Sequence, residues 1–387
     1  MHQFISRSFG GLWLLLGVLA CASGGDENAA PAGAGGGMPS AGASSQAGTA
    51  GANGGFPAAG GGPSEGGASA GAAGTTAGVG GVGSSAGSGG AAGGVSGSGG
   101  SGAGGGGAAG AAGASNEVQV FLIAGQSNAT GQGYTKNIPK TFVINTQVQL
   151  FHSSAIISGA TANIWIPLRH ASEAPDSGGD RFGPELGFGT TIQELYPGRQ
   201  IALIKHAVSA TNLVSQWAPG ADAKDTSHFG GEFKTFVATV DKGLAALRAK
   251  GQTPIIRGML WQQGEADADI GGTASSQYGQ HLAALIARVR EQWQVPDMLF
   301  IYGYVYPKSN YGSGRDQVRL GEKNVDQDSG NALAVKGAFV VETDDLQLRA
   351  NDPGTPYPSD LIHFGSAGQL ELGKRMAAKT HAKLALP

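Results

Sequence analysis

Two short motifs far apart in the chain carry side chains that could perform acyl transfer. Gly125-Gln126-Ser127-Asn128 places a serine directly after the apolar run 118–124, and Asp360 stands three residues before His363. A serine hydroxyl becomes a good nucleophile when a histidine takes its proton, and a carboxylate can hold that histidine in the required tautomer. We therefore predict Ser127 as the nucleophile, His363 as its base and Asp360 as the partner of the base. The alternative is structural: a capped strand-to-helix turn at Ser127, a helix cap at Asp360 and a surface histidine.

Acyl transfer also needs hydrogen-bond donors for the oxyanion of the tetrahedral intermediate. We expect the backbone N–H of Ser127, a backbone N–H near Ser209 and the side-chain amide of Gln263 to supply them. Gln263 lies in 261–265, a run too polar for a core, although simple solvent exposure would also explain this polarity. Polar residues flanking these motifs are predicted to contact the substrate: Gln126, Asn128 and Glu265.

The segments between these motifs alternate between short apolar runs and longer stretches with helical spacing. Strands are predicted at 118–124, 201–204, 255–261, 298–304 and 338–341. Helices are predicted at 184–196, 232–250, 275–293 and 366–384. This alternation predicts a mostly parallel sheet covered by helices on both faces, a three-layer α/β/α sandwich. Because the carboxyl ends of parallel strands meet at one edge of the sheet, the motifs should converge there.

The first 115 residues differ in composition from the rest of the chain. Arg7 precedes an apolar stretch, 10–21, that is too short to span a bilayer and is typical of an export signal. Residues 18–21 resemble a bacterial lipobox, which would place a lipid on Cys21, the only cysteine of the chain. Because Leu19 is unusual in that motif, the alternative is cleavage of the signal without lipidation. Residues 22–115, nearly all Gly, Ala and Ser, predict a disordered tether. We expect a signal at 1–21, a linker at 22–115 and an extracellular or surface-anchored domain at 116–387.

The charge of that domain excludes some classes of partner. Removing Arg7 from the 25 basic residues, and Asp26, Glu27 and Glu65 from the 28 acidic ones, leaves 24 against 25. A near-neutral domain offers no basic footprint for nucleic acid or anionic lipid, so we expect membrane contact only through Cys21. The sequence does not indicate an oligomeric state.

Three other motifs are disfavoured by their spacing. Residues 125–129 lack the second glycine of a Gly-x-Ser-x-Gly elbow. Residues 326–331 begin like a calcium loop, but the glycine and the third ligand are misplaced and residue 337 is glycine rather than glutamate. The remaining histidines show no paired spacing for zinc.

Taken together, the motifs resemble a known family. Residues 125–128, 261–267 and 360–364 look, in this order, like the sialate O-acetylesterase and acetylxylan esterase family of carbohydrate esterases, a branch of the SGNH hydrolase superfamily. Phe182-Gly183-Pro184-Glu185 is similar to another block of that family, and the resemblance spans 118–380. It implies a flavodoxin-like sheet, no metal or other cofactor, and removal of acetyl groups from sugar hydroxyls by Ser127, His363 and Asp360. Gln263 would stand where other SGNH enzymes use an oxyanion-hole asparagine.

One block departs from the family pattern. Ser209-Ala210-Thr211 stands where the family usually has a Gly-Gly-Thr-like block, and a Cβ at Ser209 would limit the approach of the backbone to the oxyanion.

Our main hypothesis is a secreted or surface-anchored serine esterase that acts on O-acetyl esters of carbohydrates, such as acetylated xylan or sialic acid. The alternatives are a non-catalytic carbohydrate-binding lipoprotein and an esterase for another small ester. The loops at 171–180 and 306–330 are expected to shape the pocket, with three aromatic residues as possible sugar platforms: Trp165, Trp217 and Tyr311.

Overall fold

The structure is a computed structural model that describes residues 116–157, 161–306, 313–384 and 386. The predicted export signal, Cys21 and the predicted linker lie outside the described residues. Within the described part, no helix is both long enough and apolar enough to pass through a bilayer.

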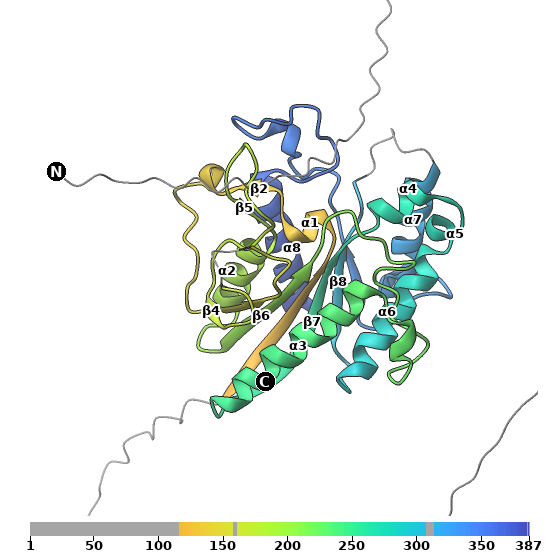
Figure 1. Ribbon diagram of the computed structural model, residues 1–387, viewed down its shortest axis with the longest axis horizontal. Helices are drawn as coiled ribbons and strands as arrows, with labels where there is room; N and C mark the ends of the chain where they lie inside the picture. Colours follow the sequence, from red (N-terminus) through yellow and green to blue (C-terminus); the bar gives the residue numbers. More distant parts are fainter. Residues whose placement is uncertain (1–115, 158–160, 307–312, 385, 387) are drawn as a thin grey trace, which may run out of the picture. The chain divides into compact units, whose positions relative to one another are not determined.

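A seven-stranded sheet forms the centre of the domain (Figure 1). Its strands, in spatial order, are β4 (Ile166–Pro167), β3 (Gln149–His152), β6 (Gln200–Ala207), β1 (Glu117–Gly125), β7 (Thr253–Gln262), β8 (Leu299–Gly303) and β9 (Ala338–Val341). Neighbouring strands are parallel except β3 and β4. A separate small sheet pairs β2 (Gly133–Tyr134) with β5 (Arg181–Phe182).

The five strands predicted from the sequence lie in the order β6-β1-β7-β8-β9. If these five strands are numbered by their order in the chain, their order across the sheet is 2-1-3-4-5, which is the arrangement of a flavodoxin-like sheet. The resemblance to this fold is thereby confirmed. Because β1 has the second strand on one side and the third on the other, the direction of winding reverses at β1, where such folds bind ligands.

Helices cover both faces of the sheet. On one face, α2 (Glu185–Leu195) and α8 (Ser366–Lys383) pack over one core cluster; on the other, α3 (Gly231–Ala249), α6 (Tyr278–Gln292) and α7 (Ser313–Val325) pack over a second. Shorter helices follow strands or loops: α1 (Ser127–Thr130), α4 (Glu265–Ile270), α5 (Gly272–Ser276), η1 (Thr135–Asn137), η2 (Thr226–His228), η4 (Gln327–Ser329) and η5 (Arg349–Asn351). The predicted three-layer α/β/α sandwich is confirmed.

Alternating side chains of β1 reach both cores, which is why residues 120–124 of this central strand are apolar without interruption. Val120 and Leu122 belong to the cluster under α3 and α6, whereas Phe121 and Ile123 belong to the cluster under α2 and α8. Successive side chains of a strand point to opposite faces, so a strand covered on both sides reads as a continuous apolar run.

The registers of the three central strands bring their carboxyl ends to the same level. Gly125 at the end of β1 lies opposite Ala207 of β6 and Gln262 of β7. The segments that follow these strands therefore start side by side. They contain the Ser127, Ser209 and Gln263 motifs singled out in the sequence.

Candidate active site

Ser127 leaves the sheet through a turn that requires glycine. Gly125 has φ +136°, and a Cβ there would lie 2.2 Å from the carbonyl oxygen of Gln262. The next residue, Gln126, donates its backbone N–H to that same carbonyl at 3.0 Å. Ser127 then begins α1, and its backbone N–H lies in the first turn, where a helix supplies no acceptor. The turn thus places both the hydroxyl and the N–H of Ser127 at the edge of the sheet.

Ser127, His363 and Asp360 form one continuous hydrogen-bonded chain. Nε2 of His363 lies 2.9 Å from Oγ of Ser127, and Nδ1 lies 2.8 Å from Oδ2 of Asp360. The other carboxylate oxygen, Oδ1, accepts the backbone N–H groups of Ile362 and His363 at 3.2 and 3.1 Å. A four-residue turn therefore sets the aspartate against the ring, as the three-residue spacing suggested. With Nδ1–H donated to Asp360, Nε2 is free to accept the serine proton.

The surroundings of Asp360 keep its carboxyl ionised. Burial alone would raise the pKa of this carboxyl, but hydrogen bonds and charge from His363, together with the backbone N–H of Ile362, outweigh burial and leave the pKa below its usual value. Arg349 stands behind the carboxylate with Nη1 3.5 Å from Oδ2 of Asp360. Its other nitrogen, Nη2, donates to the hydroxyl of Tyr134 at 2.7 Å and pairs with Asp176. Arg349 was not anticipated from the sequence.

Asn128 was predicted to contact the substrate, and the structure gives it another place. Its side chain is fully buried: Nδ2 donates to the carbonyl of Ile362 at 3.2 Å, and Oδ1 accepts the N–H of Phe364 at 2.9 Å. These bonds hold the peptide groups on both sides of His363. Nδ2 also donates to Oε1 of Glu265 at 2.9 Å. Asn128 therefore ties the loop of the base to the helix of the nucleophile.

Gln263 was predicted as an oxyanion donor, but its amide is engaged inside the protein. The side chain is fully buried, and Nε2 donates to Oε1 of Gln126 at 3.1 Å, to the carbonyl of Thr211 at 3.0 Å and to Oδ2 of Asp267 at 2.6 Å. Its Oε1 accepts the hydroxyl of Tyr278 at 3.0 Å. Two amide hydrogens shared among three acceptors leave none for a substrate, so this geometry contradicts the prediction.

Gln126, by contrast, presents an amide to the site. Its Oε1 accepts from Nε2 of Gln263 and from the backbone N–H groups of Gly264 and Ala266, at 3.1, 3.3 and 3.2 Å. These three donors orient the oxygen toward the loop after β7. The NH₂ end bonds no acceptor among the described residues, and Gln126 lines the cavity at the triad. The network around Gln263 therefore orients Gln126.

In the block after β6, a Cβ at Ser209 was expected to limit the approach of the backbone to the oxyanion. Ala210, the next residue, has a left-handed backbone with φ 58°. The backbone N–H of Ser209 donates to Oε1 of Glu173 at 2.9 Å. Its use for an oxyanion therefore requires the carboxylate of Glu173 to move away.

A buried ion pair fixes the segments around α1. Lys205 of β6 donates from Nζ to the carbonyls of Thr130 and Ala171 at 2.9 and 2.6 Å and to Oε2 of Glu185 at 2.6 Å. Burial lowers the pKa of Lys205, and the charge of Glu185 opposes this. Oε1 of Glu185 accepts the backbone N–H groups of Ala171 and Gly183. The pair thus joins the end of α1 to the loop that carries Glu173.

A cavity of about 330 Å³ opens onto the triad. Besides Ser127 and His363, its wall consists of residues from the ends of β1, β6 and β7 and from neighbouring loops: Gln126, Gln132, Glu173, Arg181, Ser209, Ala210, Glu265, Ala266, Asp269 and Ile362. Burial raises the pKa of Asp269; the positive charge of Arg315 opposes that rise and the negative charge of Glu265 adds to it. In the described part of the chain, no group of three or more His, Cys, Asp or Glu side chains is placed to hold a metal ion.

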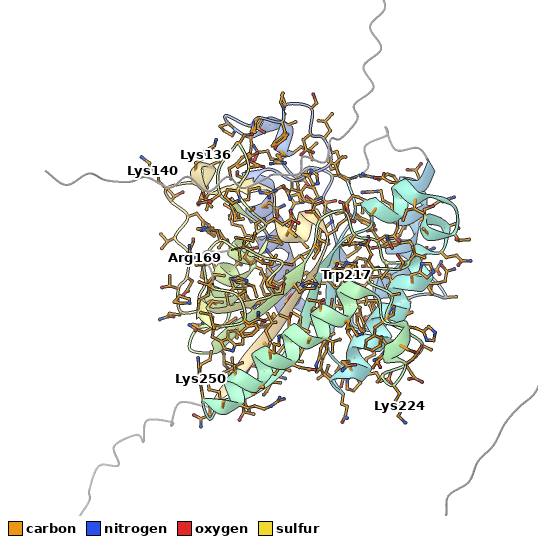
Figure 2. The ribbon with its side chains drawn as sticks, viewed as in Figure 1. Lys136, Lys140, Arg169, Trp217, Lys224 and Lys250 are labelled. Atoms are coloured by element: carbon orange, nitrogen blue, oxygen red, sulfur yellow. The ribbon has the colours of Figure 1, made fainter. Side chains whose placement is uncertain are left out.

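Two of the three aromatic residues proposed as sugar platforms, Trp165 and Trp217, do not line this cavity. Trp217, labelled in Figure 2, is fully buried and packs against Trp261, with its ring N–H donated to Oγ1 of Thr211. Trp165 donates its ring N–H to the carbonyl of Gly243, away from the cavity. Tyr311 lies outside the described residues. Most of the second expected pocket loop, 306–330, folds as α7 and η4.

Comparison with known proteins identifies the family of the chain. A family profile described as "SASA: Carbohydrate esterase, sialic acid-specific acetylesterase" matches residues 117–382. The chain belongs to this family of carbohydrate esterases. The esterase is accordingly a carboxylic ester hydrolase, and the predicted family is confirmed. No curated protein matches it.

Several solved structures resemble the esterase. NanS is 15% identical with a TM-score of 0.52, over 69% of this chain and 97% of its own. A protein of Arabidopsis thaliana is 18% identical with a TM-score of 0.50, over 70% of this chain and 100% of its own. A carbohydrate acetylesterase from Xanthomonas citri is 16% identical with a TM-score of 0.45, over 68% and 56%. At these low sequence identities, the similarity to the first two structures shows a shared fold and nothing more.

Sequence reasoning missed several charged residues of the esterase's site. Glu173 lies in the loop 171–180, which was expected to shape the pocket, and its acidic side chain was the available signal. Arg181 and Asp269 line the same cavity. Arg349 reaches Asp360 from η5, and no local pattern in the sequence marked it.

Proposed function

We propose that the esterase removes O-acetyl groups from carbohydrates through Ser127, His363 and Asp360. The observation that carries this proposal is the unbroken chain from Oγ of Ser127 through both ring nitrogens of His363 to Oδ2 of Asp360, with distances of 2.9 and 2.8 Å. The first distance lies within the range for a nucleophile and its base, and the second within the range for a base and the carboxylate that orients it. Membership in a carbohydrate esterase family supports the same chemistry.

The reaction divides into two acyl transfers. Nε2 of His363 takes the proton of the Ser127 hydroxyl as Oγ attacks the acetyl carbonyl carbon, and Asp360 stabilises the resulting imidazolium. The imidazolium then gives its proton to the sugar oxygen as the carbon–oxygen bond breaks, leaving an acetyl group on Ser127. Water repeats the sequence: it loses a proton to Nε2, attacks the acyl carbon and releases acetate, and Oγ regains its proton.

Three donors are available for the oxyanion in this proposal. The backbone N–H of Ser127 is adjacent to the attacking oxygen. The NH₂ group of Gln126 takes the place first assigned to Gln263. The N–H of Ser209 joins them when the carboxylate of Glu173 leaves it. Such donors stabilise the charge that develops in the transition state more than the neutral ester.

The test is acetate release by the purified protein. We expect the protein to hydrolyse at least one of three compounds: acetylated xylan, O-acetylated sialic acid or 4-nitrophenyl acetate. Ser127→Ala should lower kcat for that substrate by about 10³-fold or more. Ser227→Ala, at an exposed serine on η2, is the matched control and should retain wild-type activity. If no substrate loses acetate in a Ser127-dependent way, the catalytic proposal is wrong, and that result would support the hypothesis of a carbohydrate-binding protein.

We also propose that the domain works outside the cytoplasmic membrane, held by a lipid on Cys21. This proposal is supported by the sequence alone: the basic start, the apolar stretch 10–21 and the lipobox-like residues 18–21. Expression of the full chain in a bacterium with labelled palmitate should label the wild type and not Cys21→Ser. Equal labelling of both would contradict the anchor, and release of unlabelled protein to the medium would support simple cleavage.

A further inference from the structure

We propose that the cavity takes neutral, hydroxyl-bearing acetylated saccharides and disfavours anionic ones, with Glu265 accepting a hydrogen bond from a substrate hydroxyl. This inference rests on the proposed function, because it names the substrate class of the same site. Two observations on the cavity wall carry it: a buried carboxylate oxygen without a donor, and an excess of acidic side chains.

Glu265 supplies the first observation. It begins α4, lines the cavity and is only 3% exposed. Oε1 accepts a hydrogen bond from Asn128 at 2.9 Å, whereas Oε2 is buried and has no donor within the described part of the chain. A buried acceptor left without a donor carries a desolvation cost. A sugar hydroxyl is a donor that a carboxylate oxygen binds well, so a bound saccharide would remove this cost.

The charges on the cavity wall supply the second observation. Glu173, Glu265 and Asp269 contribute three carboxylates, and Arg181 contributes the one guanidinium among the described lining residues. Glu265 and Asp269 both belong to α4, which follows β7. Burial raises the pKa of Asp269; the positive charge of Arg315, which is not a lining residue, opposes this rise, and the negative charge of Glu265 adds to it. Carboxylates therefore outnumber guanidinium groups among the described lining residues.

Arg181 offsets only part of this charge, because its guanidinium is shared by Glu173 and Asp176 and already donates within the protein. Nη1 donates to Oε1 of Gln132 at 2.5 Å, and Nη2 donates to the carbonyl of Ala174 at 2.6 Å. The carboxylates of Glu173 and Asp176 lie 3.7 and 3.8 Å away. A carboxylate on the substrate would therefore meet the acids of α4, and Arg181, the one guanidinium among the described lining residues, already has its partners. Unpaired like charges are a common basis for rejecting a ligand.

The test compares substrates that differ in one charge. O-acetylated N-acetylneuraminic acid and its carboxyl methyl ester have the same ring and acetyl group, and acetate release is measured for both with the purified full chain. We expect kcat/KM for the methyl ester to exceed that of the free acid by about tenfold, equivalent to about 1.4 kcal/mol. The difference should shrink in 0.5 M NaCl, since salt screens charges.

Two variants assign this preference to the acidic wall. Asp269→Asn changes an exposed residue and should fold normally, and Glu265→Gln removes the charge next to it. Each should reduce the ratio of methyl ester to free acid severalfold. For the hydroxyl contact, wild type should prefer a monoacetylated neutral sugar to its fully acetylated form, which has no hydroxyl to donate, and Glu265→Ala should lose most of this preference.

The outcomes separate the two proposals. Ser127-dependent acetate release with equal or better use of the free acid overturns this inference and leaves the proposed function intact. An unchanged ratio of kcat/KM for methyl ester to free acid in both Asp269→Asn and Glu265→Gln also overturns this inference. Absence of Ser127-dependent release from every substrate overturns the proposed function, and this inference with it.

Discussion

Replacement of Asn128 by alanine should separate positioning of the base from binding of the substrate. Asn128 does not line the cavity, yet its amide bonds the peptide groups before and after His363. The substitution removes the side chain that fixes His363 relative to Ser127 and leaves both triad residues chemically unchanged. We therefore expect kcat to fall while KM stays close to that of wild type.

The size of the effect follows from the bonds that are lost. Three hydrogen bonds disappear, to Ile362, Phe364 and Glu265. At about 1 kcal/mol each, the free energy of unfolding should fall by about 3 kcal/mol, which lowers Tm by roughly 6–12 °C for a domain of this size. A displacement of about 1 Å between nucleophile and base costs about 10²-fold in rate, so kcat should fall by that factor.

The assay is steady-state hydrolysis of 4-nitrophenyl acetate at 20 °C, with circular dichroism to show that the variant is folded. Leu285→Ala on α6 is the matched control, because it removes a fully buried side chain of the core at about 2–5 kcal/mol and Leu285 does not line the cavity. Its kcat should remain that of wild type. Unchanged kcat in Asn128→Ala, or an equal loss in both variants, would refute the positioning role.

Three further predictions concern charged residues. Glu173→Ala should raise kcat about 3- to 10-fold by freeing the N–H of Ser209 for the oxyanion; unchanged or lower kcat would remove Ser209 from that role. Asp360→Asn should lower kcat by about 10³–10⁴-fold. Because the native pKa of Asp360 is depressed, its carboxylate adds stability above pH ~4 that is lost as pH falls through the native pKa, so urea unfolding should show the gap between variant and wild type closing in acid. Burial raises the pKa of Glu322 well above its usual value, so the free energy of unfolding of the wild type should decline as pH rises above ~4.3. Glu322→Gln should therefore raise Tm at pH 7 but not at pH 4. A lower Tm of the variant at pH 7 would contradict this.

The sequence alone predicted the layers of the fold, and it singled out the three residues Ser127, His363 and Asp360 that the structure joins by hydrogen bonds. Strands β1, β6, β7, β8 and β9 are apolar runs because helices cover them on both sides, and the period of the apolar residues distinguishes these strands from the helices between them. Asp360 and His363 could be paired because the contact is local and a single turn brings them together. Elements with weak local signals were missed: β3, β4, and α7, which has a largely polar sequence.

Only the tertiary structure decided what each polar side chain at the sheet edge does. Asn128, Gln126 and Gln263 all stand beside strand ends in the sequence, yet two are buried in networks and one presents its amide to the cavity. The partners of Asn128 and Gln126 are more than a hundred residues away, and so is one of the partners of Gln263, so no local pattern reveals which donor is already occupied. The same holds for Glu173 on the N–H of Ser209. Hydrogen-bond capacity is fixed by residue type, but its use is fixed by long-range packing.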